Sequence, residues 1–372
     1  MIRRRGDIVV SSLRTESHDG GYRASADVDG IPLWFESGDI ELAALPEAFG
    51  SALLLTSQHY RRRLVFERPI CSQWAGNVSQ VIAKWASWWG YRPLEPAAQT
   101  RDPRKRTNSP ASALCFSGGV DSFYSLHTGP RPDFLIAVHG FDIPLADRLR
   151  MAALQKTLSA AADSVGARPI IIRTNLREHP VSGRPKLWER SHGGALAAVG
   201  HVLGPNISRL FISSTYSINP DKQWGSSVHT DHLFSSGVLE VVHFGTAPRE
   251  EKIQAILTHP MVRDHLRVCW ENTKPEGNCS RCPKCLLVML QLAEYGVLEE
   301  FAVFDGAEEL SDRLDAVPYL PTHVLVMQRA VERGRLEPRL SAAAHRLVER
   351  SLRAVPWRRR RAQIRDLVDR YV

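Results

Sequence analysis

Short apolar runs alternate with helical patterns through the middle of the chain, from residue 113 to about residue 300. Helical spacing is clearest over residues 146–165 and 194–203, each of which is followed by an apolar run. Apolar strands that alternate with helices are typical of a parallel sheet covered on both faces. We therefore predict an α/β fold with a parallel five-stranded sheet and helices on both faces, built from the apolar runs 113–116, 134–138, 169–173, 209–213 and 239–243.

The regions on either side of this alternating part follow other patterns. Residues 1–96 mix short strand patterns with an apolar stripe at helical spacing over residues 78–89, which predicts a small N-terminal α+β accessory domain. Residues 97–112 are rich in Pro, Ala, Arg and Ser without periodicity, which is typical of a linker. Residues 301–372 are helical in pattern and predict a C-terminal helical extension to a central domain over residues 113–300.

Composition places the chain among globular proteins. Hydrophobic residues make up 43% of the 372 positions and charged residues 24%, which suits a folded protein with a large core. No apolar run reaches the roughly 18–20 residues that a membrane span needs. The basic N-terminus is not followed by the apolar core of a signal peptide. We expect a cytoplasmic protein with no membrane contact.

The formal net charge of +8 and the pI of 9.3 favour anionic partners such as nucleotides or nucleic acid, although a solvated basic surface has the same charge. Part of the excess is local, in residues 101–106 and 358–361. Both stretches are candidates for contact with phosphates, and both are also typical of solvated surface.

Residues 117–122, Ser-Gly-Gly-Val-Asp-Ser, join the first apolar strand to a helical pattern. A glycine turn that leads into a helix N-terminus forms an anion site, because the first backbone N–H groups lack intrahelical partners and the helix dipole favours negative charge. Gly118 and Gly119 allow close approach to a phosphate, and Ser117 and Ser122 add hydroxyl donors.

The spacing is not that of the Walker loop, because the Gly-x-x-x-x-Gly-Lys pattern is missing. The loop instead resembles that of the PP-loop ATP pyrophosphatases. The resemblance implies that ATP binds at Ser117, Gly118, Gly119, Val120, Asp121 and Ser122 while a substrate oxygen attacks the α-phosphate.

Polar residues also follow the other predicted strands, where ligands of parallel sheets bind. His139 and Thr174 are candidates for nucleotide contact, and Ser214 is a candidate for substrate contact. Two further clusters could contact substrate. Arg190 and His192 precede the predicted helix at residue 194, and His229, Asp231 and His232 form a His-x-Asp-His pattern suited to substrate contact or acid–base work.

Four of the six cysteines have the spacing C-x9-C-x2-C-x2-C, at Cys269, Cys279, Cys282 and Cys285. Thiolates two residues apart can bind one ion, and four of them complete a tetrahedral Zn²⁺ site with a structural role. An iron–sulfur cluster uses the same ligand type and remains an alternative.

A PP-loop followed by a late four-cysteine motif resembles the 7-cyano-7-deazaguanine synthases, the QueC-like branch of the superfamily. Those enzymes use ATP and ammonia to convert a carboxylate on a deazapurine to an amide and then a nitrile, and they carry zinc. The resemblance covers about residues 113–295. It also implies that Lys252, which follows the last strand in a proline-containing segment, faces phosphate or substrate.

These observations predict an adenylating C–N ligase that forms AMP and pyrophosphate with ATP, Mg²⁺ and Zn²⁺. The catalytic residues would be Ser117, Asp121 and Lys252, with Asp121 positioning the magnesium ion or the helix start. The substrate is a small carboxylic acid or, given the additional N-terminal region, a protein or nucleic acid in a defence-type role. A zinc-bearing module that binds nucleotide or nucleic acid without catalysis is the alternative, and a homodimer is left open.

Overall fold

A computed structural model describes residues 6–103, 111–183, 185–217, 223–274, 276–320 and 324–371, without the side chains of residues 185, 186 and 355–371. The basic residues 104–106 and the side chains of residues 358–361 lie outside this description. The chain forms two compact units, Met1–Pro248 and Arg249–Val372. The first unit contains the N-terminal region and the parallel strands, and the second contains the four cysteines and the helical tail. None of the described helices has the length and apolar character needed to cross a membrane.

The first unit is organised on one nine-stranded sheet with the order β11-β10-β7-β8-β9-β3-β2-β1-β4. The strands β7 to β11 are mutually parallel, as the apolar runs predicted. The strands are β1 (Ile8–His18), β2 (Gly21–Val28), β3 (Ile31–Ser37), β4 (Leu64–Phe66), β7 (Ser112–Cys115), β8 (Phe134–His139), β9 (Arg168–Thr174), β10 (Arg209–Ser213) and β11 (Glu240–Phe244), with a separate two-stranded pair of β5 (Ile70–Cys71) and β6 (Thr100–Arg101).

The prediction of a five-stranded sheet is therefore wrong in its extent. The strands of residues 8–66 do not form a sheet of their own, because β3 pairs antiparallel with β9 and continues the parallel sheet. Sequence patterning identifies strands by their apolar periodicity, but the pairing of two distant edges leaves no local signal.

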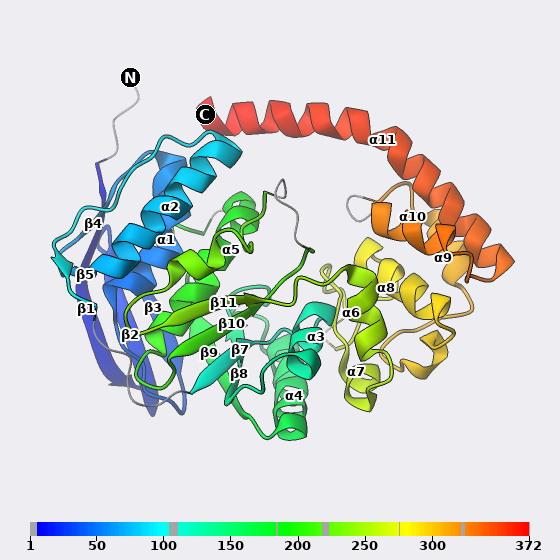
Figure 1. The fold of residues 1–372 in the computed structure, drawn as a ribbon, viewed down its shortest axis with the longest axis horizontal. Helices are drawn as coiled ribbons and strands as arrows, with labels where there is room; N and C mark the ends of the chain where they lie inside the picture. Colours follow the sequence, from blue (N-terminus) through cyan, green and yellow to red (C-terminus); the bar gives the residue numbers. More distant parts are fainter. Residues whose placement is uncertain are drawn as a thin grey trace. The chain divides into compact units, whose positions relative to one another are not determined.

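Helices cover both faces of the parallel strands, as expected. Figure 1 shows α3 and α4 on one side of these strands and α1, α2 and α5 on the other. Gly194 of α5 lies so close to α1 that a Cβ atom there would be 2.4 Å from the Ser51 carbonyl oxygen. The helices are α1 (Pro46–Tyr60), α2 (Ser72–Trp89), α3 (Val120–Thr128), α4 (Arg148–Val165) and α5 (Pro185–Val202), with the 3-10 turn η1 (Asp231–Phe234).

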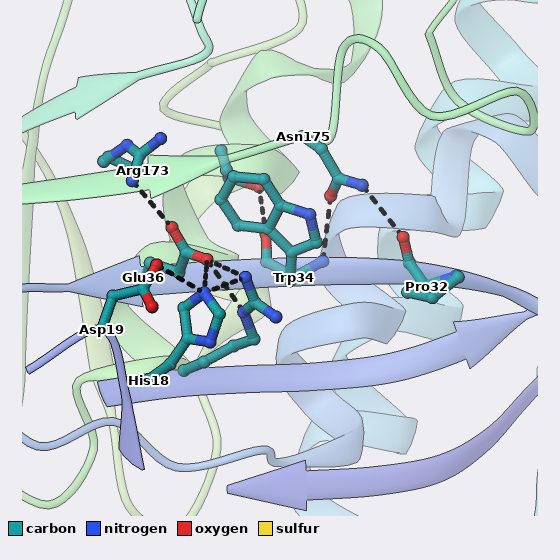
Figure 2. A network of polar contacts seen from close by, with 9 residues as sticks. His18, Asp19, Pro32, Trp34, Glu36, Arg173 and Asn175 are labelled. Carbon is teal, nitrogen blue, oxygen red and sulfur yellow. Dashed lines mark hydrogen bonds and ion pairs between the residues drawn. The ribbon is translucent and has the colours of Figure 1, made fainter. Parts of the chain in front are cut away.

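The junction between β3 and β9 is completed by a side chain where the backbone pairing ends (Figure 2). The Asn175 carboxamide accepts a hydrogen bond from the Trp34 N–H at 2.9 Å and donates one to the Pro32 carbonyl at 2.9 Å. The Thr174 hydroxyl donates to the Trp34 carbonyl at 2.7 Å. Asn175 thus replaces a further backbone pair of the ladder.

A buried carboxylate fixes the other end of the same junction. Glu36 is 7% exposed and accepts hydrogen bonds from Arg23 Nε at 2.8 Å and from Arg173 at 3.1 Å, so charges on three strands meet at one residue. Figure 2 also shows His18 beside this carboxylate, 3.3 Å away. Charge-assisted bonds of this kind are about twice as strong as neutral ones.

Replacement of Asn175 by Ala is expected to weaken this junction. The Trp34 N–H and the Pro32 carbonyl would both lose a protein partner, and because neither bond is fully buried we expect a cost of about 0.5–1.5 kcal/mol in the free energy of unfolding of the first unit. Chemical denaturation and hydrogen exchange at the Trp34 amide would measure it. Asn175→Asp keeps the acceptor and should be intermediate, whereas unchanged protection in Asn175→Ala would contradict the role.

The second unit is helical. Its helix α8 is buried along nearly its whole length and forms the centre of this unit. Glu294 at the end of α8 is paired with Arg333, and Arg333 also contacts Glu250 at 3.4 Å. The helices are α6 (Arg249–Ile256), α7 (Pro260–His265), α8 (Pro283–Glu294), α9 (Leu310–Ala316), α10 (Val324–Glu332) and α11 (Pro338–Tyr371), with the turn η2 (Leu298–Glu300).

Candidate functional site

The strand, glycine turn and helix expected around residue 117 are present. Strand β7 ends at Cys115 and α3 begins at Val120, with Gly119 as its N-cap. Gly118 has a φ of 73°, a conformation that glycine adopts without strain. The first N–H groups of α3 have no intrahelical partners, so the turn presents donors at the carboxyl end of β7.

The loop lies at the point where the order of the parallel strands reverses. From β7 the chain proceeds to β8 and β9 on one side, then returns through α5 to β10 on the other side of β7. Where the connections from two neighbouring strands run in opposite directions, a crevice forms outside the carboxyl ends of those strands. Ligands of such sheets bind in this crevice. The sheet therefore places residues 117–122 and the residues after β10 at one ligand-binding edge.

A small pocket opens at this edge, where β10 and β11 end. Burial raises the pKa of Tyr216, and the negative charges of Asp121 and Glu189 also raise it, so both carboxylates are close enough to act on the Tyr216 hydroxyl. The pocket is lined by Ser214, Tyr216, Ser217, Trp224, Ser226, Ser227, Val228 and His243.

Within the loop, the expected nucleotide ligands have different environments. Ser117 is exposed and Asp121 is half-buried in the first turn of α3. Ser122 is 3% exposed, and its hydroxyl donates to the Gly119 carbonyl at 2.9 Å, so it stabilises the turn. The Val120 side chain is 2% exposed, so only the backbone of this residue could contact a ligand.

His139 and Thr174 are engaged in the fold. His139 is 6% exposed, and its Nε2 lies 2.9 Å from the Pro144 carbonyl oxygen. Burial lowers its pKa, so its ring is neutral at pH 7. The Thr174 hydroxyl donates to Trp34 and accepts from the Leu176 N–H at 3.2 Å. Both residues end strands at the expected edge, but Nε2 of His139 and the hydroxyl of Thr174 already have partners.

Arg190 and His192 do not precede a helix, because α5 begins at Pro185 and includes both. The following glycines serve close packing instead of a helix start: a Cβ atom on Gly193 would lie 2.4 Å from the Gly225 carbonyl oxygen. Arg190 donates to the Tyr91 hydroxyl at 3.0 Å and lies over the Trp89 ring. His192 packs edge-on against the Trp224 ring of the pocket, and burial lowers its pKa.

The His-x-Asp-His pattern does not converge on one point. Asp231 is fully buried, whereas His232 is exposed. The ring of His229 packs edge-on against Trp88, and its Nε2 atom is buried without a hydrogen-bond partner among the described residues. Ser214 is 2% exposed and lines the pocket.

Lys252 lies on α6 of the second unit, near the start of a helix as the resemblance implies. Its side chain is 1% exposed. A buried ammonium group requires polar partners, so Lys252 is not an ordinary surface lysine.

The four cysteines meet in the second unit. Their Sγ atoms all lie within 4.8 Å of one another, and each cysteine is buried. Zn–S bonds of about 2.3 Å in a tetrahedron place the sulfurs about 3.8 Å apart. The Sγ atoms of Cys279 and Cys285 are 3.8 Å apart, too far for a disulfide. The cluster can therefore hold a metal such as zinc.

Backbone geometry supports this cluster. The Cys282 N–H donates to Cys279 Sγ at 3.2 Å, and the Cys285 N–H donates to Cys282 Sγ at 3.5 Å. Cys282 is also the N-cap of α8, whose positive end favours a thiolate. Asn278 is 2% exposed and accepts hydrogen bonds from the N–H groups of Val268 and Cys269, which fixes the distant first ligand.

His243 was not predicted as a site residue, because the sequence pattern placed it only at the end of the fifth strand. The signal was its position: polar residues at the carboxyl ends of parallel strands lie at the ligand edge. Tyr216 and Trp224 were also not selected, although both line the pocket.

A scan against protein-family models finds no match to the chain, and searches of curated proteins and of solved structures find none either.

Proposed function

We propose that the protein is an ATP-dependent adenylating enzyme that cleaves ATP to AMP and pyrophosphate and joins an activated carboxylate to a nitrogen nucleophile. The observation that carries this proposal is the Ser-Gly-Gly-Val-Asp-Ser turn between β7 and α3, at the point where the strand order reverses. A turn with this composition, position and helix dipole is suited to a polyphosphate.

In the proposed reaction a carboxylate oxygen attacks the α-phosphorus of ATP, and pyrophosphate leaves into the loop. The N–H groups at the start of α3 and the exposed Ser117 hydroxyl stabilise the negative charge of the departing pyrophosphate. Asp121 lies in the same turn, where its carboxylate can hold Mg²⁺, which neutralises phosphate charge when bound. Positioning and charge stabilisation then account for most of the rate.

The metal proposed for the four cysteines is Zn²⁺ with a structural role. All four ligands come from the protein and are buried, so no coordination position is left for water. Their compact arrangement suits a single ion. The metal would join the segment around Cys269 to the start of α8.

The proposed activity can be tested by acid-dependent ATP–pyrophosphate exchange. Zinc-replete protein is incubated with ATP, Mg²⁺, labelled pyrophosphate and a panel of carboxylic acids that includes 7-carboxy-7-deazaguanine. We expect label to enter ATP only with a suitable acid, which would also name the substrate class. Nucleotide binding without exchange for any acid of the panel would favour a macromolecular substrate or the non-catalytic alternative instead.

A further inference from the structure

The pocket at the ends of β10 and β11 contains an ordered acid–base pair. Asp231 is fully buried, and its Oδ2 atom lies 2.8 Å from Nδ1 of His243. The same carboxylate accepts hydrogen bonds from the Ser226 hydroxyl at 2.6 Å and from the Ser227 N–H at 3.0 Å. Three donors hold this carboxylate in one orientation, so it also fixes the histidine ring.

This hydrogen bond determines which nitrogen of His243 is free. A carboxylate accepts hydrogen bonds, so Nδ1 carries the proton and Nε2 keeps its lone pair. His243 lines the pocket, and its Nε2 has no hydrogen-bond partner in the described part of the chain. The ring therefore presents a proton acceptor to the pocket.

Neighbouring groups do not suit covalent catalysis. The Ser226 hydroxyl donates to Asp231 and not to His243, so it is not activated as a nucleophile. Burial, together with the negative charge of Asp231, raises the pKa of the Cys115 thiol to about 12. That influence also places Asp231 near the end of β7, where the Ser-Gly-Gly turn begins.

We propose that His243 is the base that takes a proton from the nitrogen nucleophile, with Asp231 as its positioning residue. This role rests on the proposed adenylating function. As the nitrogen forms a bond to the acyl carbon, the bond from that carbon to the AMP oxygen breaks and AMP leaves with the electron pair. The proton released by the nitrogen passes to Nε2, and the imidazolium beside Asp231 then loses it to solvent.

The first test is NMR of the full chain labelled with ¹⁵N-histidine and ¹⁵N-glycine, with Mg²⁺ and α,β-methylene-ATP as the probe. We expect the His243 ring, assigned with His243→Asn, to be protonated on Nδ1 alone and to shift when the nucleotide shifts Gly118 and Gly119. An Nε2–H tautomer, or a His243 signal that stays fixed while the glycine signals move, would overturn the inference. Fixed glycine signals would instead overturn the proposed function.

Kinetics test whether His243 acts in the nitrogen-dependent step alone. His243→Asn retains a donor for Asp231 but removes Nε2, so we expect amide formation with ammonium as the nitrogen source to fall about 100-fold or more. Pyrophosphate exchange is measured with an acid that is active with the unaltered protein. Its fold-loss in His243→Asn should be at least about 10 times smaller than that of amide formation, because no nitrogen reacts in that half-reaction. Equal losses in the two assays would contradict the assignment. His345→Asn, at an exposed position on α11, is the control.

Discussion

Replacement of Cys282 by Ala is expected to abolish metal binding and unfold part of the second unit. Cys282 supplies one metal ligand and is the N-cap of α8, where its Sγ atom accepts a hydrogen bond from the Cys285 N–H. Its loss should therefore disrupt both the metal site and the start of the helix. Structural zinc contributes about 10–16 kcal/mol of apparent binding free energy in small zinc domains, so we expect the unfolding transition of this unit to be lost or strongly lowered. Metal analysis and calorimetry would measure both effects.

The matched control is Cys71→Ala, which removes a buried cysteine of the first unit, outside the cluster. It should retain about one zinc ion per chain and lose only about 1–2 kcal/mol from the small cavity. Full metal content in Cys282→Ala would contradict the four-ligand site. Iron with labile sulfide in the purified protein would identify a cluster instead of zinc.

Replacement of Asp121 by Ala is expected to lower AMP formation about 100-fold or more, the usual scale for the loss of one group that stabilises developing charge. Asp121 lies in the first turn of α3 beside the glycine turn, where its carboxylate can position Mg²⁺ and phosphate. Folding should be nearly unchanged, because a half-buried acid at a helix start contributes only about 0.3–1 kcal/mol.

The control for this variant is Asp163→Ala, which removes an exposed acid near the end of α4. It should keep full activity. Steady-state rates of AMP release and thermal unfolding would be compared for both variants. Full activity in Asp121→Ala would contradict the proposed role of Asp121 in positioning Mg²⁺ and phosphate.

Local features of this molecule could be predicted from its sequence. The apolar runs identify the five parallel strands, the glycine turn identifies the start of α3, and the spacing of four cysteines identifies the cluster in the second unit. Each of these depends on residues close together in the chain. Periodicity and turn chemistry report directly on such neighbours.

Features that depend on distant pairing could not be predicted in the same way. The antiparallel pairing of β3 with β9, and the Asn175 hydrogen bonds to Trp34 and Pro32 that extend it, join residues about 140 positions apart. The glycines at 193 and 194 suggested a helix start, yet they lie inside α5, where the carbonyl oxygens of Gly225 and Ser51 leave no room for a side chain. The function of His243 depends on Asp231, whose orientation no sequence pattern encodes.

In the proposed reaction, ATP is cleaved between its α- and β-phosphates at the turn formed by residues 117–122. The most direct test is ³¹P NMR of a reaction containing the zinc-replete protein, ATP, Mg²⁺, ammonium and the panel of acids. We predict AMP and pyrophosphate in equal amounts, formed only when a suitable acid is present. ADP and phosphate as the products would contradict the claim, because they require attack at the γ-phosphate.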